Sequence, residues 1–576
     1  MPPRTIAPAI ALEIVPARLP QLAGRQPARE TFVDGPLVFG LHLRDGAIAR
    51  GGIGIYPHTA GLRSLLVRRL DGQVARNAAI VPNAAQGGLV VKNGDGSSAR
   101  EEEAFRSYIE ALLDVVDNVQ EGRPKVPVGI VAYDGPDPYR VIGPGPGTEG
   151  LLETANELAR RRELWLGPGF AALAGRDEQK NAAEVTARGA WESVRRHFAE
   201  IGRDIDREEI TVAGIGNLGT PEFAHALLLS RRVQLRAAFD QRHIFLDPNP
   251  EPARAFTERE RLFCDPTRSW HDYDRSVISA GGGVYARAAA TIELPAAARD
   301  MLGLSADDVG GADIVRAILG METDLLVSAG GGTFVKAADE SNAAAEDPDN
   351  DGVRIDGSTV AAKVVVELRE GVFTQAGRVD YALAGGRINS AAIDLGAEIQ
   401  LRDRQVNVEI AISPTAEGPR LSAAERLPLA AEARARNAEI TLGRCRDRVR
   451  AISLDRTRSI DGLDDFADAL TLLERDGFID RRRHHLPQRE TLRLRRRHFV
   501  GLTHPEISML AAHAKVALRQ LILDSDLPDD PFFERYLRSY FPEVVDARCG
   551  QGVRSHRLRR NIVAAELANA MVDCMG

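Results

Sequence analysis

The chain has 576 residues, which is too long for one domain and predicts two to four. Hydrophobic residues make up 44% and charged residues 27%, as in a globular protein, and the net charge of −8 argues against a general nucleic-acid-binding surface. Four widely spaced cysteines form no disulfide framework and no zinc motif, so no metal is expected. No apolar run reaches the roughly 18 residues needed to span a bilayer. We therefore expect a cytoplasmic protein that binds neither membrane nor nucleic acid.

The first 150 residues are rich in expected strands. The stretch IAPAIALEIV, residues 6–15, is interrupted by Glu13 and predicts a strand, not a secretion signal. The alternating stretch 31–52 predicts a hairpin that turns at Asp45 and Gly46. The stretch NAAIVPNAAQGGLVVKNG, residues 77–94, predicts a strand, a tight glycine turn and a second strand, and residues 126–135 predict a further strand.

Helical periodicity begins near residue 151. Apolar residues recur at spacings of three and four in 150–164 and 186–202. From about 210 to 400, short apolar strands alternate with helices, which predicts parallel βαβ units, and the polar stretch 338–352 is expected to be a loop. After about 415 only helices are expected.

The strongest local motif is GIGNLG in ITVAGIGNLGTPEFAHALLLS. An apolar strand precedes it, a helix follows, and a second strand ends in Asp240, about 20 residues on. In this arrangement glycines let a pyrophosphate approach the helix amides, and the acid accepts the ribose hydroxyls of NAD. The motif predicts an NAD-binding Rossmann domain whose cofactor-binding residues include the following: Gly214, Gly216, Asn217, Leu218, Gly219 and Asp240.

Two other stretches carry weaker signals. DPDNDG, residues 347–352, resembles the start of a calcium loop, but the position that needs a bidentate Glu is Ser358. The basic run 481–499 is best interpreted as a solvated or intersubunit helix face, with anion or nucleic-acid binding as the alternative.

Several longer stretches resemble the large bacterial NAD-specific glutamate dehydrogenases, from about residue 10 to the end. The C-terminal stretches LTHPEISMLAAHAKVAL and HRLRRNIVAAELAN resemble the helical tail of that family. The chain is similar to the catalytic core plus tail, without the long N-terminal regulatory region. The most specific matches are GLHLR, ARGG, RNAAIVP, TARGAWESVRRHF, AAFDQRHIFLDPNPEPARAFTERERLF, SAGGGVYAR and DYALAGGRIN.

The resemblance implies an α/β, two-lobed amino-acid dehydrogenase fold. Its expected parts are a mixed α/β substrate lobe over 1–175, a Rossmann NAD-binding domain over 176–410 and a helical C-terminal region over 411–576. The implied reaction is oxidative deamination of L-glutamate to 2-oxoglutarate and ammonia with NAD as hydride acceptor. The expected assembly is a homo-oligomer, with a hetero-oligomer containing an active paralogue as the alternative.

Residue-by-residue matching assigns the implied roles. Arg50 in ARGG and Arg76 in RNAAIVP match substrate-binding cations, although the family has a Lys at position 76. Gln86 falls where the family has its catalytic Lys, and an amide cannot supply an ammonium of tunable pKa. Asp137 is expected to transfer protons, with Asp134 as its near competitor. Thr186 in TARGAWES joins the cofactor-binding set.

Other departures fall on the expected substrate and nicotinamide contacts. Pro146 replaces a Lys of DKGT, Ser328 an Asn, Gly396 a Ser, and 366–370 reads VELRE where the family has GEGGN. Three hypotheses stay open. The chain is a glutamate dehydrogenase of weakened activity, a catalytically inactive NAD(H)-binding regulatory paralogue, or a dehydrogenase for a different amino or oxo acid.

Overall fold

The computed structural model describes most of the chain, and its residues group into two compact units. Unit 1 comprises residues 1–179, 399–439 and 518–569, and unit 2 comprises 180–398, 440–517 and 570–576. The described residues are 9–18, 26–94, 96–120, 123–127, 129–131, 135, 137–171, 176–263, 265, 267–413 and 421–575. Within these ranges no helix is long and apolar enough to cross a membrane.

Unit 1 is built on a six-stranded mixed sheet in the order β1-β2-β3-β5-β4-β8. Strands β1, β2, β3 and β5 are antiparallel neighbours, whereas β4 runs parallel to β5 and β8. The strands are β1 (Ile10–Ile14), β2 (Arg29–Asp34), β3 (Val38–Arg44), β4 (Ala49–Ile55), β5 (Asn83–Val91) and β8 (Arg140–Pro144), and a separate ribbon joins β6 (Asn118–Gln120) to β7 (Arg123–Lys125). The strand expected near the N-terminus is confirmed as β1.

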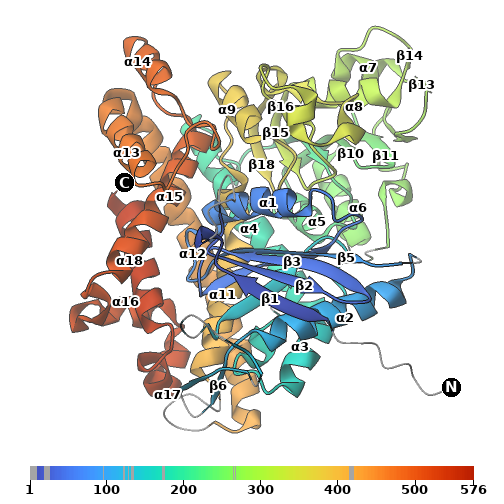
Figure 1. The fold of residues 1–576 in the computed structure, drawn as a ribbon. Helices are drawn as coiled ribbons and strands as arrows, with labels where there is room; N and C mark the ends of the chain where they lie inside the picture. Colours follow the sequence, from blue (N-terminus) through green and yellow to red (C-terminus); the bar gives the residue numbers. More distant parts are fainter. Residues whose placement is uncertain are drawn as a thin grey trace, which may run out of the picture. The chain divides into compact units, whose positions relative to one another are not determined.

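Helices cover both faces of this sheet (Figure 1). On one face α1 packs its leucines on Leu41 and Leu43 of β3, and on the other α2 and α3 contribute to the large core that contains Phe105 and Tyr108. The helices of the N-terminal part of unit 1 are α1 (Leu62–Asn77), α2 (Ser98–Asp114) and α3 (Leu152–Arg161).

Two strand predictions in unit 1 are wrong. The turn at Asp45 and Gly46 does not close a hairpin, because β5 inserts between β3 and β4 and pairs with both. The hairpin in this stretch is β2–β3, which closes at residues 35–37. The described part of 126–135 forms no strand, and the remainder of that stretch lies outside the described residues.

Unit 2 contains the parallel βαβ arrangement that the alternating pattern predicts. Its sheet has the order β12-β11-β10-β9-β15-β18, in which β9, β10, β15 and β18 are parallel and β11 and β12 form an antiparallel edge. The strands are β9 (Ile210–Ile215), β10 (Val233–Phe239), β11 (His243–Leu246), β12 (Gly283–Ala286), β15 (Thr323–Ser328) and β18 (Ala362–Glu367), with short pairs β13 (Ile292–Glu293) with β14 (Asp308–Val309) and β16 (Val335–Lys336) with β17 (Ile355–Asp356).

The helices between and after these strands pack on both faces of the sheet, and two hydrophobic cores result. They are α5 (Pro221–Leu228), α6 (Pro252–Phe263), α7 (Ala296–Leu302), α8 (Gly311–Gly320), α9 (Gln375–Leu383) and α10 (Ala391–Asp394). The loop expected over 338–352 contains only short 3-10 turns at Asn342–Ala345 and Pro348–Asn350.

The regular elements among the described residues after 415 are all helices, as expected, and turns and loops connect them. Helices α13 (Leu463–Arg475) and α14 (Arg489–Arg497) lie in unit 2, whereas α16 (Glu534–Tyr540) and α17 (Glu543–Arg554) lie in unit 1. Five further helices contribute residues to both units: α4 (Arg176–Glu200), α11 (Gly396–Ala411), α12 (Ala423–Asp461), α15 (His504–Leu523) and α18 (Arg559–Met575).

The basic run 481–499 differs in part from the solvated face expected for it. The Arg481 side chain is buried, and its guanidinium donates to Glu474 at 3.0 Å and to Thr471 at 2.8 Å. Arg495 forms a buried ion pair with Glu506 at 2.7 Å. These two cations therefore act as internal ties, because a buried arginine needs a carboxylate partner.

Candidate functional site

A pocket of about 350 Å³ lies in unit 2 at the carboxyl ends of β9, β10 and β15. Strand β10 follows β9 on one side in the sheet, and β15 lies on the other side. The connection after β9 leads to β10, whereas the connection after β15 leads to β18 on the opposite side, so the strand order reverses between β9 and β15. Open α/β sheets bind ligands at such a switch point. The glycine-rich turn of the GIGNLG motif contributes Gly216 and Asn217 to the pocket lining.

Glycines shape the strand ends at this pocket. A Cβ on Gly216 would lie 2.9 Å from the Phe223 ring and 3.2 Å from the Ala329 Cβ, and a Cβ on Gly214 would lie 2.6 Å from Phe223. These two positions therefore need glycine so that α5 can pack against the strand. Across the pocket, Gly330 has a φ of 95°, which L side chains rarely adopt. The walls are thus made of backbone that a ligand can approach closely.

Asn217 links the glycine turn to the acid at the end of β10. Its Oδ1 accepts from the Gly219 backbone N–H at 2.6 Å, and its Nδ2 donates to Asp240 at 2.7 Å. The other carboxylate oxygen of Asp240 accepts from the backbone N–H groups of Arg242 and His243 at 2.7 and 2.6 Å. A carboxylate has about four acceptor positions, so one direction on Asp240 is left for a ligand hydroxyl.

Three arginines give the pocket positive charge. Arg287 donates to the Asp240 carbonyl at 2.9 Å, and its guanidinium lies 5.5 Å and 5.4 Å from the ring centres of Phe239 and Phe334. Arg242 and Arg369 also line the pocket. Positive charge beside exposed backbone and an acid is the combination that a dinucleotide needs for its phosphates and ribose. The described residues therefore fit the cofactor that the GIGNLG motif predicts.

Trp270 stabilises the glycine turn through a hydrogen bond. Its indole N–H donates to the Gly216 carbonyl at 2.9 Å, and its ring stacks on Phe245 with centres 4.9 Å apart. Ser269 and Asp272 form a capping box around Trp270, because each side chain accepts from backbone on the other side of the turn.

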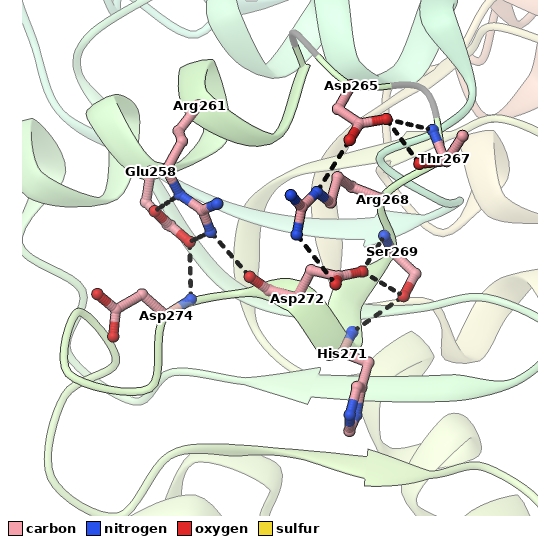
Figure 2. Close-up of polar contacts among 9 residues, drawn as sticks. All are labelled: Glu258, Arg261, Asp265, Thr267, Arg268, Ser269, His271, Asp272 and Asp274. Carbon is pink, nitrogen blue, oxygen red and sulfur yellow. Dashed lines mark hydrogen bonds and ion pairs between the residues drawn. The ribbon is translucent and has the colours of Figure 1, made fainter.

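Figure 2 shows the polar network that holds this segment. Arg268 bridges Asp265 and Asp272 at 3.1 and 3.4 Å, and Glu258 accepts from Arg261 and from the backbone N–H of Asp274. These hydrogen bonds connect the segment that contains Trp270 to α6, and others connect residues within the segment. Sequence reasoning missed both Trp270 and Arg287, although Arg287 lies in the quoted stretch SAGGGVYAR.

The remaining residues of the expected cofactor set do not line the pocket. Thr186 is buried on α4 and donates to the Ala182 carbonyl of its own helix at 2.8 Å. Leu218 is buried in the core beneath the sheet, and Gly214 contacts Phe223. These residues shape the unit from inside, whereas Gly216, Asn217 and Asp240 face the pocket.

In unit 1, Gln86 lies in the middle of β5. The expected glycine turn is wrong, because Asn83–Val91 is one continuous strand that pairs with β3 and β4. The two glycines instead allow close packing. A Cβ on Gly87 would lie 2.7 Å from Ile53, and one on Gly88 would lie 2.9 Å from Tyr56.

The Gln86 side-chain amide forms a hydrogen bond within the protein. Its Nε2 donates to the Oε1 of Gln73 on α1, and the Nε2 of Gln73 donates to the Arg50 carbonyl at 3.0 Å. The amide is buried, so it presents a hydrogen-bonded neutral group where the resemblance implies an ammonium. Lys92 does not replace it, because its Nζ pairs with Asp34 at 2.6 Å. Six strand residues separate the two positions by about 20 Å.

Arg50 is a buried cation whose backbone carbonyl accepts from Gln73. It lies on β4, and its Nη1 has no hydrogen-bond partner among the described residues. Burial lowers the pKa of Arg50, and the nearby Asp403 carboxylate opposes that shift. A buried guanidinium with an open nitrogen is suited to receive a carboxylate. Arg76 lies half-buried in the last turn of α1.

Asp137 lies in a separate network of buried charges. Its Oδ2 accepts from Arg44, and its Oδ1 has no partner among the described residues. Glu13 accepts from Arg44 and Arg140, both at 2.8 Å. Burial alone would raise the pKa of Glu13, but the two arginines lower it to about 2.

The structure does not bring Asp137 and Gln86 to one face of the sheet. Arg44 pairs in register with Ala85, whereas Gln86 pairs with Leu43. Side chains alternate along a strand, so Arg44 leaves the sheet on the opposite face from Gln86. Asp134, the competitor of Asp137, lies outside the described residues.

The other departures lie in packed surroundings. Ser328 is buried at the end of β15, and Glu367 on β18 forms a buried ion pair with Arg378 at 2.5 Å. Pro146 contacts the strand end, since a Cβ on Gly54 would lie 2.9 Å from the Pro146 ring. Gly396 begins α11. Each substitution is accommodated by the fold.

Comparison with known proteins places this arrangement in a family. The model of the bacterial NAD-glutamate dehydrogenase catalytic domain matches residues 3–455, and the model of the glutamate dehydrogenase C-terminal region matches 500–576. The chain belongs to the bacterial NAD-glutamate dehydrogenase family. The family resemblance expected from the quoted stretches, and the α/β dehydrogenase fold, are confirmed.

Family members of known name are much longer than this chain. The NAD-specific glutamate dehydrogenase of Mycobacterium tuberculosis is 38% identical over 98% of the chain and 36% of its own length. The enzyme of the same name from Pseudomonas aeruginosa is 35% identical over 97% of the chain and 35% of its length. The chain thus spans about a third of the length of these relatives.

Solved glutamate dehydrogenases are more distant in sequence. The hetero-hexameric enzyme from Thermus thermophilus is 15% identical with a TM-score of 0.43, and covers 89% of this chain and 90% of its own. The enzyme from Peptoniphilus asaccharolyticus is 11% identical with a TM-score of 0.41, and covers 90% of this chain and 92% of its own.

Proposed function

We propose that this chain binds NAD(H) in the pocket of unit 2. The supporting observations are the switch-point position, the backbone walls at Gly216 and Gly330, and the open acceptor direction on Asp240. Asn217 would fix the position of the Asp240 carboxylate relative to the glycine turn. NAD, when bound, supplies the hydride acceptor. The relatives' name, NAD-specific glutamate dehydrogenase, supports the same cofactor.

The proposed reaction is that of the relatives, oxidative deamination of L-glutamate to 2-oxoglutarate and ammonia, at a strongly weakened rate. Arg50 would receive a substrate carboxylate through its open nitrogen, with Arg76 as the second cation. Asp137, which the resemblance implies as the proton-transferring group, is left out of this proposal, because its partner Arg44 projects from the opposite face of the sheet from Gln86. The cytoplasmic location and the oligomeric assembly stay predictions.

The observation that carries the proposal of weakened activity is the Gln86–Gln73 hydrogen bond. Deamination develops charge at the reacting carbon and its oxygen, and an ammonium group stabilises it while exchanging protons. A buried amide already bonded to Gln73 does neither. Losing one such group costs about 10²- to 10⁴-fold in rate.

The second proposal is a catalytically inactive NAD(H)-binding regulatory subunit, alone or assembled with an active relative. It is favoured by the contrast between unit 2, where Gly216, Asn217 and Asp240 line the pocket, and unit 1, where Gln86 replaces the lysine of the family pattern. A third proposal, a dehydrogenase for a different amino or oxo acid, would use Gln86 as a hydrogen-bonding group.

The variant Gln86→Lys tests the proposed function. A lysine at this position restores the ammonium that the family pattern contains. We expect glutamate-dependent reduction of NAD to rise at least about 10-fold above wild type, measured as NADH absorbance in a steady-state assay. The double variant with Arg76→Lys should rise at least as far.

Gln520→Lys provides the matched control. Gln520 is exposed on α15 and already bonds to Asp524, so the same substitution there should leave the rate unchanged. An unchanged rate in Gln86→Lys that still binds NADH would favour the regulatory subunit over the weak enzyme. Failure of the wild type to bind NADH would contradict both.

A further inference from the structure

Three side chains that the proposed function does not use converge in unit 2. His197 and Glu200 lie three residues apart on α4, so they share one face of the helix. His504 is the first residue of α15. One potential ligand atom from each of the three lies within 4.8 Å of the others. No sequence pattern predicts this group, because 304 residues separate Glu200 from His504.

His197 is the unsatisfied member of the group. Its side chain is 2% exposed, and neither ring nitrogen has a hydrogen-bond partner among the described residues. Its ring packs edge-on against His504 with centres 4.9 Å apart. Buried polar atoms nearly always have a partner, and leaving one without costs about 1–3 kcal/mol. A ligand that accepts an imidazole lone pair would satisfy His197.

The other two members already have the spacing of shared ligands. The Nε2 of His504 lies 3.2 Å from Glu200 Oε1. Two ligand atoms on one tetrahedral zinc, with bonds of about 2.0–2.1 Å, lie about 3.3 Å apart. Two imidazoles and one carboxylate form a donor set that suits zinc. Calcium and magnesium instead favour sites made of oxygen ligands.

We propose that His197, Glu200 and His504 bind one zinc ion, with a water molecule as the fourth ligand. The ion would join the C-terminal end of α4 to the N-terminal end of α15, two elements that are distant in the chain. It would lie beside Arg387, whose carbonyl accepts from Val365 of β18 at 2.9 Å. The proposed role is therefore structural, fixing the tail helices to the sheet of unit 2.

Two arginines face Glu200 and oppose a cation. The Nε of Arg196 lies 3.8 Å from Oε1, and that of Arg387 lies 3.4 Å from Oε2. Their side chains are 35% and 23% exposed, so solvent screens their charge. Arg196 also donates to Ser453 at 2.7 Å. The alternative is an ion-pair network without metal, which leaves both His197 nitrogens unsatisfied.

Metal binding by the full chain tests the proposal. Protein dialysed against a chelator should take up about one equivalent of zinc in a calorimetric titration, and metal analysis after gel filtration should give the same ratio. Cobalt in place of zinc should produce the visible absorption of a tetrahedral site. Zinc binding should also raise the midpoint of thermal unfolding, because it favours the folded state.

The variants His197→Gln, Glu200→Gln and His504→Gln should each weaken zinc binding by at least about 100-fold. His498→Gln is the matched control, since His498 is exposed in the same unit and lies outside the group. Near-UV circular dichroism and NADH binding, which should persist in all four variants, report correct folding and separate this test from that of the cofactor site.

Two results would overturn the proposal. One is a wild-type protein that takes up no zinc and shows no tetrahedral cobalt spectrum. The other is zinc uptake that the three variants leave as strong as in the control. If a variant does not fold, the wild-type cobalt spectrum and stoichiometry decide alone, because they need no substitution.

Discussion

At the scale of single residues, Asp240 is the most direct probe of the cofactor pocket. Its carboxylate holds Asn217 and retains one open acceptor direction. Hydrogen bonds to a charged group contribute about 1.5–3 kcal/mol. Asp240→Ala should therefore weaken NADH binding by about 10- to 100-fold, measured by calorimetry or NADH fluorescence.

The control for this variant is Glu322→Ala. Glu322 is exposed just before the amino end of β15, at the edge of the sheet away from the pocket. It should bind NADH as the wild type does. Equal affinity in Asp240→Ala and wild type would mean that the pocket is not the nucleotide site.

The residues of the cofactor pocket are the part of the site that the sequence predicts best. The GIGNLG motif and Asp240 were predicted as a site, and the structure places Gly216, Asn217 and Asp240 around one pocket. The partner of Gln86 was not predictable, because Gln73 lies on a helix whose register against β5 depends on tertiary packing. His197, Glu200 and His504 were hidden for the same reason.

At the scale of elements, the segment around Trp270 is expected to stiffen the glycine turn. Trp270→Phe keeps the aromatic stack on Phe245 but removes the donor to the Gly216 carbonyl. We expect a loss of about 1 kcal/mol in the free energy of unfolding, and NADH binding that is weakened several-fold. Chemical denaturation and NADH titration measure the two effects.

Unit 1 offers a control of identical chemistry. The indole of Trp165 donates to the Pro138 carbonyl at 2.7 Å. Trp165→Phe should cost similar stability and leave NADH affinity unchanged. If both variants weaken NADH binding equally, the effect belongs to global destabilisation and not to the turn.

Helices and strands are predicted correctly where the hydrophobic periodicity is clear. The prediction fails in β5, where a glycine pair is compatible with either a turn or a strand. The repeated strand–helix alternation of 210–400 predicts the parallel sheet because each parallel strand needs a crossover. In β5 the pair Gly87 and Gly88 resembles a turn, yet it serves close packing against Ile53 and Tyr56. Whether glycine bends a chain or admits a neighbour depends on contacts that are remote in sequence.

At the scale of the whole molecule, buried histidines predict acid sensitivity. His556 accepts from the Leu558 backbone N–H at 3.1 Å through Nδ1, and its Nε2 lies 3.1 Å from the Asn407 carbonyl, so the folded state needs the neutral ring. Burial lowers the pKa of His556 to about 4. Between pH 6.5 and about 4 the unfolded chain binds a proton that the folded chain does not.

The free energy of unfolding should therefore fall as pH decreases through this window, by about 3 kcal/mol from His556 alone. Below about pH 4.5 Glu13 adds a further loss, because its folded pKa of about 2 lies below its usual value. Urea unfolding at a series of pH values measures the slope. His556→Gln should flatten it above about pH 4.5, and an unchanged slope would contradict the assignment.

The division of the tail between the two units was the least predictable feature at this scale. A helical region over 411–576 was expected as a separate part, and whether it acts as one stays a prediction. In the structure α13 and α14 group with unit 2, and α16 and α17 with unit 1. Helical periodicity identifies a buried face but not the surface that covers it.

We propose that the chain retains a cofactor pocket but lacks the ammonium that deamination needs. The most direct test is the turnover number of the purified wild-type protein with saturating L-glutamate and NAD. Enzymes typically turn over at about 10 s⁻¹. With Gln86 in place of the lysine, we predict a value at least about 100-fold lower. A turnover number near 10 s⁻¹ would contradict the proposed loss of activity.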